Sequence, residues 1–225
     1  MNSARSHTSL WREGELRLVA EGYGQTRTVV VRQPFARFGT LQGCELSLGG
    51  PGMPKRLLYF HVTKDGIFAL PLVPRDRFAP LPSGWFPLSG RFAVGPYRIS
   101  WEWSGQSAGQ QASSPEGFPP EPTARGTAAV NRMAKILVDN RPYGQMRLTR
   151  ALTLVGRRPP CHVVFTSRTV SSCHCVIICD NEDVWVVDLC SGNTSMLDGQ
   201  PISAARWPNG STLTLGRVSL VLEEW

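Results

Sequence analysis

The chain has 225 residues, with 24 Lys and Arg side chains against 17 Asp and Glu side chains, and a formal net charge of +7. The charge excess is +6 in residues 1–103, zero in residues 104–133 and +1 in residues 134–225. Because the excess is diffuse and no nucleic-acid-binding motif accompanies it, the composition does not favour a nucleic-acid partner.

Signals for export or membrane insertion are missing from the sequence. No apolar run approaches the roughly 18 residues of a membrane span, and no apolar segment follows the start of the chain. Six Cys residues are too few for a disulfide-built scaffold, and we expect them to be reduced. These features predict a soluble, cytoplasmic protein without a membrane partner.

The apolar runs of the chain predict an all-β protein. They are short, rich in Val, Leu, Ile and aromatic residues, and separated by many of the 22 Gly and 18 Pro residues, without sustained helical periodicity. In chain order, strands are expected at Glu15–Ala20, Thr26–Arg32, Glu45–Leu48, Leu57–Val62, Ile67–Leu72, Tyr97–Trp103, Lys135–Val138, Leu152–Val155, His162–Phe165, Cys175–Cys179, Val184–Leu189, Thr212–Leu215 and Val218–Leu222.

A segment with almost no aliphatic side chains separates the two groups of strands. Residues 104–133 are rich in Gln, Ser, Gly, Pro and Glu, and such a segment buries too little apolar surface to offset the entropy of ordering it. We therefore expect domains at residues 1–103 and 134–225, joined by a flexible linker at 104–133.

The two halves of the sequence align with each other. A shift of 117 residues places Gly39 on Gly156, Cys44 on Cys161 and Leu72 on Leu189 without a gap. Identities are few, but the strand pattern stays in register, which indicates an internal duplication.

The second half carries an ordered set of short motifs. Gly156-Arg157 ends an expected strand, Ser171-Ser172-Cys173-His174 precedes the next, and Asp188 to Thr194 reads DLCSGNT, followed by Asp198-Gly199 and Leu215-Gly216. This order resembles the forkhead-associated (FHA) domain, whose pattern runs Gly-Arg, Ser-x-x-His, Asp-x-x-Ser-x-Asn-Gly, Asn-Gly and a late Leu-Gly. The resemblance covers residues 134–225. It implies an all-β fold class, with FHA-like β-sandwiches of about eleven strands and two twisted sheets each.

The resemblance also implies roles for individual side chains. Arg157 would grip the phosphate of a phosphothreonine peptide, Ser171 would donate its hydroxyl to the phosphate, and Ser172 could add a second donor. Asn193 would hydrogen-bond the peptide main chain, and His174 would pin the loop from inside. A guanidinium and several donors suit a group with nearly two negative charges.

Two positions depart from the family pattern. Thr194 stands where the family usually has Gly, and a β-branched residue tolerates positive φ poorly, so Gly192 is expected to supply the conformational freedom of this loop. Asp198 replaces the second Asn, an exchange that a hairpin turn accommodates.

The first half resembles an FHA domain that has lost this chemistry. Gly39 is followed by Thr40 instead of Arg, and Pro54 and Leu57 replace the Ser and His. We expect a degenerate FHA-like copy that does not bind phosphothreonine. Lys55 and Arg56 are interpreted as a solvated turn.

Other chemistry finds little support in the sequence. Cys173, His174, Cys175 and Cys179 suggest a zinc site, but strand alternation would place Cys173 and Cys175 on the face opposite His174, in an apolar row that continues to Cys179. Small buried cysteines are therefore favoured, with no metal and no cofactor. No nucleophile motif or carboxylate pair predicts an enzyme.

The sequence therefore predicts a phosphothreonine-dependent adaptor in Ser/Thr kinase signalling, whose partners are phosphothreonine proteins, the kinase itself or its substrates. The alternative is a phosphate-independent scaffold or dimerisation module built of two FHA-like sandwiches. A third reading, nucleic-acid binding through the basic first half, predicts a steep loss of affinity with salt.

Overall fold

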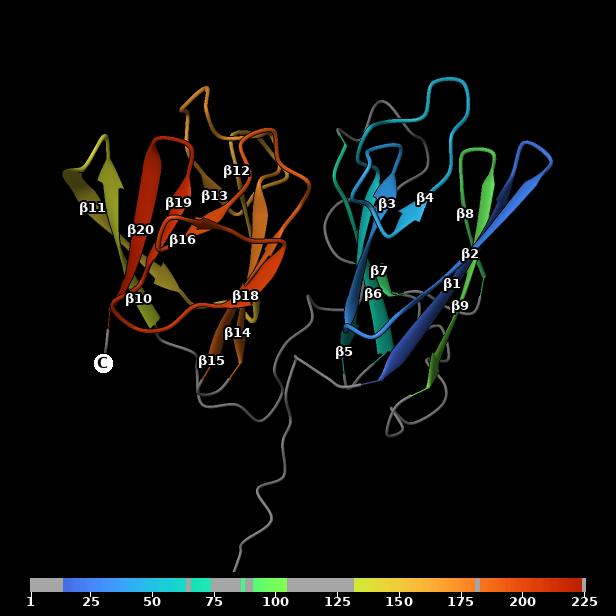
Figure 1. Cartoon of the computed structure of the whole chain (residues 1–225), viewed down its shortest axis with the longest axis horizontal. Coiled ribbons are helices and arrows are strands. Elements are labelled where there is room, and N and C mark those ends of the chain that lie inside the picture. Colours follow the sequence, from blue (N-terminus) through green and yellow to red (C-terminus); the bar gives the residue numbers. More distant parts are fainter. Residues whose placement is uncertain are drawn as a thin grey trace, which may run out of the picture.

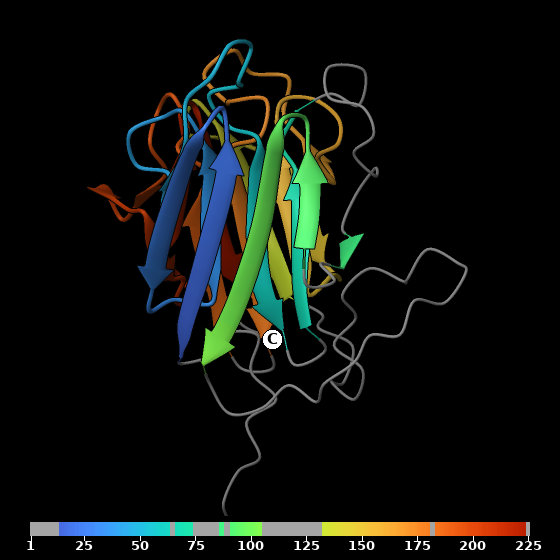
Figure 2. The same cartoon turned by 90° about the vertical axis from the view of Figure 1, so that its right-hand side faces the viewer.

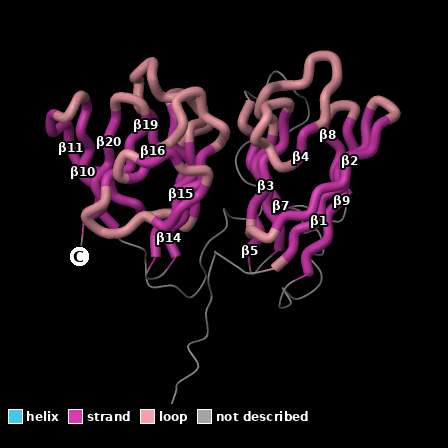
Figure 3. The backbone as a smooth tube through the Cα atoms, viewed as in Figure 1, coloured by secondary structure: helices cyan, strands magenta, loops and turns pink. Residues whose placement is uncertain are grey.

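The computed structural model describes residues 14–63, 66–73, 86–87, 91–104, 132–180 and 183–223, which form twenty β-strands. Figure 3 shows strands and loops throughout this part of the chain, and none of it forms a helix long and apolar enough to cross a lipid bilayer. The all-β prediction is confirmed. The linker expected at 104–133 falls mostly on residues 105–131, which lie outside the described residues.

The first domain is a sandwich of two sheets, an outer one in the order β2-β1-β9-β8 and an inner one in the order β4-β3-β5-β6-β7. Its described strands are β1 (Glu15–Gly22), β2 (Gln25–Val31), β3 (Phe35–Gly39), β4 (Leu46–Ser47), β5 (Leu58–Thr63), β6 (Gly66–Pro71), β7 (Phe86–Pro87), β8 (Arg91–Val94) and β9 (Tyr97–Ser104).

The second domain repeats this plan, with an outer sheet β11-β10-β20-β19-β16-β17 and an inner sheet β13-β12-β14-β15-β18. Its strands are β10 (Arg132–Val138), β11 (Arg141–Leu148), β12 (Leu152–Gly156), β13 (Val163–Val164), β14 (Cys175–Asp180), β15 (Asp183–Asp188), β16 (Met196–Leu197), β17 (Gln200–Pro201), β18 (Ala204–Arg206), β19 (Thr212–Leu215) and β20 (Val218–Glu223).

The strands β3 to β6 recur as β12 to β15 after a shift of 117 residues. For example, β3 covers Phe35–Gly39 and β12 covers Leu152–Gly156, and each is paired in parallel by the next short strand and antiparallel by the one after it. The inner sheets of the two domains therefore share both strand order and register.

The burial patterns explain why these residues form outer and inner sheets. The outer strands β1 and β20 alternate between buried and accessible residues, because one face of an outer sheet meets solvent. The inner strands are continuous apolar runs, such as the β14 segment from Cys175 to Cys179, whose residues are all buried. A sheet that is buried on both faces requires such a run.

The inner faces are buried on both sides because the two domains dock. Figure 1 shows the two inner sheets facing each other across the middle of the molecule, and Figure 2, seen from the end, shows the sheets one behind another. Each domain has its own apolar core. A third buried cluster, here called the interdomain layer, joins the domains and comprises Phe35, Tyr59, Phe68, Leu70, Leu72, Ala151, Leu152, Leu154, Cys173, Val176, Ile178, Val187 and Leu189.

The structure corrects the expected ends of the linker. Ser104 closes β9 and Arg132 and Met133 belong to β10, so both ends of the expected linker are parts of strands. The second domain has eleven strands, as expected, whereas the first has nine among its described residues.

Candidate functional site

Arg157 stands at the end of β12, where the chain leaves the inner sheet. Its backbone N–H donates to the carbonyl oxygens of Ser171 (2.9 Å) and Ser172 (3.1 Å), and its side-chain Nε donates to Val170 O at 3.1 Å. The guanidinium is thus held against the 170–172 loop. Within the described structure, its two terminal nitrogens have no hydrogen-bond partner and remain available to a ligand.

Gly156 allows the strand end to approach this loop. A Cβ at Gly156 would lie 2.3 Å from Ser172 O and 2.9 Å from Cys173 Cα, closer than real Cβ atoms come. Only glycine fits this position. The close contact of Gly156 with Ser172 and Cys173 fixes the distance between Arg157 and the 170–172 loop.

His174 holds the same loop from the inside. It is fully buried, and its Nδ1 accepts the backbone N–H of Ser171 at 3.0 Å. Burial lowers the pKa of His174, and Arg56 acts in the same direction, while Asp188 and the Asn193 backbone act against it. The imidazole therefore stays neutral, which its acceptor role requires.

Asp188 organises the second loop, residues 189–195. This role was not predicted from the sequence. Its buried carboxylate accepts the backbone N–H and hydroxyl of Ser191 (2.9 and 2.7 Å) and the backbone N–H and hydroxyl of Ser195 (3.0 and 2.7 Å). The signal was present in the sequence as an Asp three residues before a Ser, a spacing that suits a carboxylate capping its own turn.

Two hydrogen bonds connect the loops. The Gly192 N–H donates to Ser171 Oγ at 3.0 Å, and Asn193 Nδ2 donates to Thr169 O at 2.8 Å. Ser171 still has its hydroxyl hydrogen to donate, and Asn193 keeps its amide oxygen. The structure thus brings Arg157, Ser171 and Asn193 into one bonded unit.

Ser172 and the late Gly216 lie at the edges of this unit. The Ser172 side chain is half-buried, and its carbonyl also accepts the Cys161 thiol at 3.0 Å. Gly216 has φ +65°, and a Cβ there would lie 2.4 Å from Thr169 Oγ1. The late glycine therefore lets the β19–β20 turn pack against the loop that Asn193 holds.

The expectation that Gly192 supplies left-handed freedom is wrong. Neither Gly192 nor Thr194 has positive φ; the left-handed residue of this loop is Cys190, with φ 53°. The chain turns at Cys190, two residues after the end of β15. Thr194 therefore lies in the loop without the strain that its β-branch would suffer at positive φ. Asp198 and Gly199 form the expected hairpin turn, with φ 47° and 80°.

Residues 153–216 match the FHA domain family. Residues 153–216 form an FHA domain. FHA domains are interaction modules known for phosphothreonine-dependent binding. No curated protein matches the chain.

Several solved structures resemble the chain at low identity. The FHA domain of the CT664 protein from Chlamydia trachomatis is 22% identical, with 42% of this chain and 98% of that chain covered and a TM-score of 0.40. EmbR from Mycobacterium tuberculosis, in complex with a low-affinity phosphopeptide, is 24% identical, with 45% and 26% covered and a TM-score of 0.38. The yeast splicing factor Pml1 is 24% identical, with 44% and 85% covered and a TM-score of 0.39.

We expected Cys173, Cys175 and Cys179 to lie on one face of a strand, and the structure shows that they do not. Cys175 and Cys179 lie in the core of the second domain, as alternation predicts, but Cys173 lies in the interdomain layer and donates its thiol to Leu72 O at 3.7 Å. The reason is that β14 begins at Cys175, so strand alternation does not extend back to Cys173. The described residues contain no group of three or more potential metal ligands.

The interpretation of Arg56 as part of a solvated turn is also wrong. Its Nη1 donates to Cys173 O at 2.6 Å, inside the FHA domain, and to Leu189 O at 3.4 Å. The expectation failed because the partners are main-chain carbonyls more than a hundred residues away, which leave no trace beside Arg56 in the sequence.

Proposed function

We propose that the FHA domain binds phosphothreonine-containing proteins through Arg157, Ser171, Ser172 and Asn193, and that the protein acts as a cytoplasmic adaptor in Ser/Thr kinase signalling. The observation that carries the proposal is Arg157: a cation fixed by Val170 O, with two terminal nitrogens open and the Ser171 hydroxyl beside its loop. Such a fork matches phosphate oxygens and costs little entropy to order. The partner would be the kinase or one of its substrates.

We assign the first domain to a degenerate FHA-like copy. Thr40 N donates to Pro54 O (3.3 Å) and Lys55 O (3.0 Å), the same backbone pattern that Arg157 N makes in the second domain, but no guanidinium follows. A Cβ at Gly39 would lie 2.1 Å from Lys55 O, as Gly156 lies against Ser172. The scaffold of the site is thus repeated without its cation or hydroxyl.

The test is a binding titration of the full chain with degenerate phosphothreonine, phosphoserine and unphosphorylated peptide pools. We expect the phosphothreonine pool to bind best, and Arg157→Ala to weaken binding at least about tenfold, because bonds to a charged group are lost. Arg157→Lys keeps the charge but loses the fork and should bind weakly. Arg147→Ala, an exposed site on β11, is the charge-matched control.

The same titration also tests the alternative function, a phosphate-independent scaffold. The interdomain layer favours this second candidate, because it shows that these sandwiches can serve as docking surfaces. If no pool binds above its unphosphorylated control, or Arg157→Ala binds like the unmutated chain, the adaptor proposal fails and the scaffold takes its place.

A further inference from the structure

Arg56 connects the first domain to both loops of the candidate site. Its acceptors, Cys173 O and Leu189 O, belong to different segments: Cys173 follows Ser171 and Ser172, and Leu189 begins the 189–195 loop. One guanidinium therefore spans the point where the two loops leave the inner sheet.

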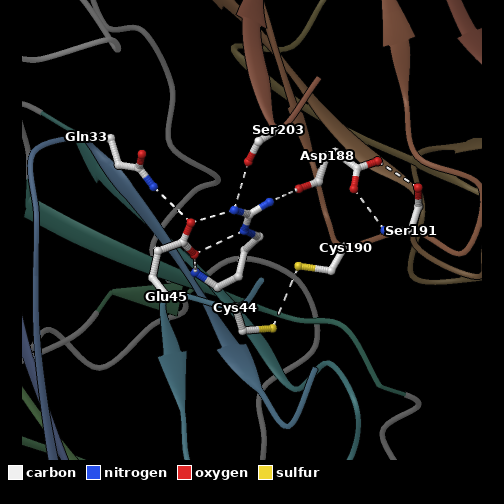
Figure 4. A network of polar contacts seen from close by, with 8 residues as sticks. Gln33, Cys44, Glu45, Asp188, Cys190, Ser191 and Ser203 are labelled. Atoms are coloured by element: carbon white, nitrogen blue, oxygen red, sulfur yellow. Dashed lines mark hydrogen bonds and ion pairs between the residues drawn. The ribbon is translucent and has the colours of Figure 1, made fainter. Parts of the chain in front are cut away.

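Arg37 makes a second contact of the same kind. Its Nη1 donates to Asp188 O at 2.7 Å and its Nη2 to Ser203 Oγ at 3.0 Å. Glu45 pairs with the buried guanidinium through both carboxylate oxygens, at 2.5 and 3.0 Å. Figure 4 shows Glu45 on one side of this network and Asp188, Ser191 and Ser203 on the other.

The interdomain layer surrounds these contacts with apolar side chains. Cys173 and Leu189, whose carbonyls Arg56 binds, are themselves buried members of the layer, at 2% and 0% exposure. Their carbonyls cannot turn to water while the domains are docked. A buried acceptor that loses its donor costs more than the bond itself contributed.

We propose that the first domain is the positioning half of a composite binding unit, in which Arg56 fixes the spacing of the two phosphopeptide-binding loops. This inference rests on the proposed function. Arg56 touches no ligand; it acts through Cys173 and Leu189 on Ser171 and Asn193, and it lies close enough to His174 to disfavour protonation of that imidazole. The first domain, without binding chemistry of its own, would thus set the affinity of the second.

The experiment compares full-length variants with one phosphothreonine peptide chosen from the binding pool. Arg56→Met keeps the side-chain length but removes the donors, and we expect at least about a tenfold loss of affinity from two buried carbonyls left unpaired. Arg56→Lys, which retains a cation, should lie between. Arg27→Met, an exposed position on β2, is the matched control and should bind like the unmutated chain.

A second readout separates positioning from loss of folding. The backbone N–H resonances of Ser171 and Gly192, both held by bonds within the site, should shift in Arg56→Met at a temperature well below its unfolding midpoint. If the unmutated chain binds phosphopeptide, and Arg56→Met and Arg56→Lys both bind it as tightly as the unmutated chain does, the positioning role is refuted. The proposed function then still stands. If the unmutated chain does not bind, both fail.

A pair of thiols faces across the same interface and carries a second inference. Cys44 Sγ of the first domain lies 3.8 Å from Cys190 Sγ of the second. Figure 4 shows the two thiols pointing toward each other. Cys190 borders a groove of about 410 Å³ that Gly43, Thr194 and Ile202 also line, so small solutes can reach it. The hydrogen bond with Cys44 lowers the pKa of Cys190 to about 7, and Arg37 acts in the same direction.

We infer that a hydroperoxide converts Cys44 and Cys190 into an interdomain disulfide. The Cys190 thiolate attacks a peroxide oxygen to give a sulfenic acid and release water or an alcohol; the Cys44 sulfur then attacks the Cys190 sulfur and displaces the hydroxyl as water. Two thiols are oxidised and one peroxide is reduced. The bond would fix the loop that carries Asn193 to the first domain.

Peptide mapping of the full chain after hydrogen peroxide and alkylation tests this step. We expect a Cys44–Cys190 cross-linked peptide, a higher unfolding midpoint, and loss of both effects in Cys44→Ser. Cys161→Ser is the control, because Cys161 and Cys173 form the other close pair, with their sulfurs 4.0 Å apart. A cross-link found only between Cys161 and Cys173, or none at all, would overturn the inference.

Discussion

At the scale of single residues, Gly39 and Gly156 carry the same constraint in both domains. Each ends a strand of an inner sheet, and a Cβ at either position would meet a main-chain oxygen of the following loop, at 2.1 and 2.3 Å. These distances cannot be relieved by turning a side chain, because the obstacle is backbone. The glycine in front of Arg157 therefore belongs to the machinery that positions the guanidinium.

Gly156→Ala should both destabilise the chain and weaken phosphopeptide binding. The new methyl group pushes Ser172 and Cys173 away from β12, at a cost of about 1–3 kcal/mol in the free energy of unfolding, and displaces Arg157 from its loop. Chemical denaturation and peptide titration measure the two effects. Gly144→Ala adds the same methyl group where nothing lies within 4 Å and should be nearly neutral. Equal stabilities of the two variants would refute the argument.

His174 should make stability fall at mildly acidic pH. Its pKa in the folded chain is lower than the ordinary value of about 6.5, so the unfolded chain takes up a proton first as the pH drops. Stability is therefore full above about pH 7.5 and is lost progressively below about pH 6.5, until the folded pKa is reached. Protonation of Nδ1 would also break the bond with Ser171 N.

Denaturant titrations at several pH values check this prediction. His174→Gln offers an acceptor to Ser171 N but does not titrate, so its free energy of unfolding should depend less on pH between about 7 and 5, by up to about 1.4 kcal/mol per pH unit. An unchanged slope in His174→Gln would show that another group controls acid sensitivity.

At the scale of elements, most strands that the sequence predicted have a clear burial signal, although β2, which has no buried residue, was also predicted. The inner strands β5, β6, β14 and β15 were found as apolar runs, and β1, β9 and β20 were found by alternation. The edge strand β11 was missed because seven of its eight residues are not buried, and it contains Pro142 and Gly144. Such a strand is held mainly by pairing with β10, and among its residues only Leu148 and Met146 pack into the core.

Two further kinds of element escaped prediction for different reasons. Strand β3 is buried at every position but contains Arg37, whose charge in the interior requires the pairing with Glu45 and the bonds to Asp188 O and Ser203 Oγ. Strands β16, β17 and β18 have two or three residues each and were not predicted, although β4 and β13, with two residues each, lie within predicted strands. In the site, short motifs in family order pointed to Arg157, Ser171 and Asn193, whereas the contacts of Arg56 and Arg37 depend on docking.

At the scale of the whole molecule, four stacked sheets enclose three apolar layers. The middle layer contains five residues of the first domain and eight of the second. Each inner sheet therefore packs on one face against the core of its own domain and on the other face against the interdomain layer. Residues 58, 60 and 62 of β5 face the first domain's core, while Tyr59 between them faces the interdomain layer. Neither domain can lose its inner sheet without exposing the layer that stabilises the other, which predicts unfolding in one transition.

Glu45→Gln tests this coupling because Glu45 neutralises the cation that bridges the domains. Arg37 is 6% exposed, and leaving its charge without a carboxylate costs about 3–5 kcal/mol. Hydrogen exchange in increasing denaturant, followed by mass spectrometry, should show β1 and β20 unfolding together in the unmutated chain. In Glu45→Gln, the midpoints of both strands should fall by the same amount, because the Arg37 guanidinium that Glu45 holds also donates to Asp188 O and Ser203 Oγ of the second domain.

The matched control is Glu102→Gln, which removes an ion pair of the first domain alone. Arg17 and Glu102 are 3.2 Å apart with side chains 53% and 74% exposed, and such a pair contributes at most about 1 kcal/mol. Both midpoints should then stay nearly where they are. If Glu45→Gln lowers the midpoint of β1 and leaves that of β20 in place, the domains unfold independently. Arg37 and Arg56 would then hold two separately stable sandwiches, and the positioning of the binding loops would have to come from the second domain itself.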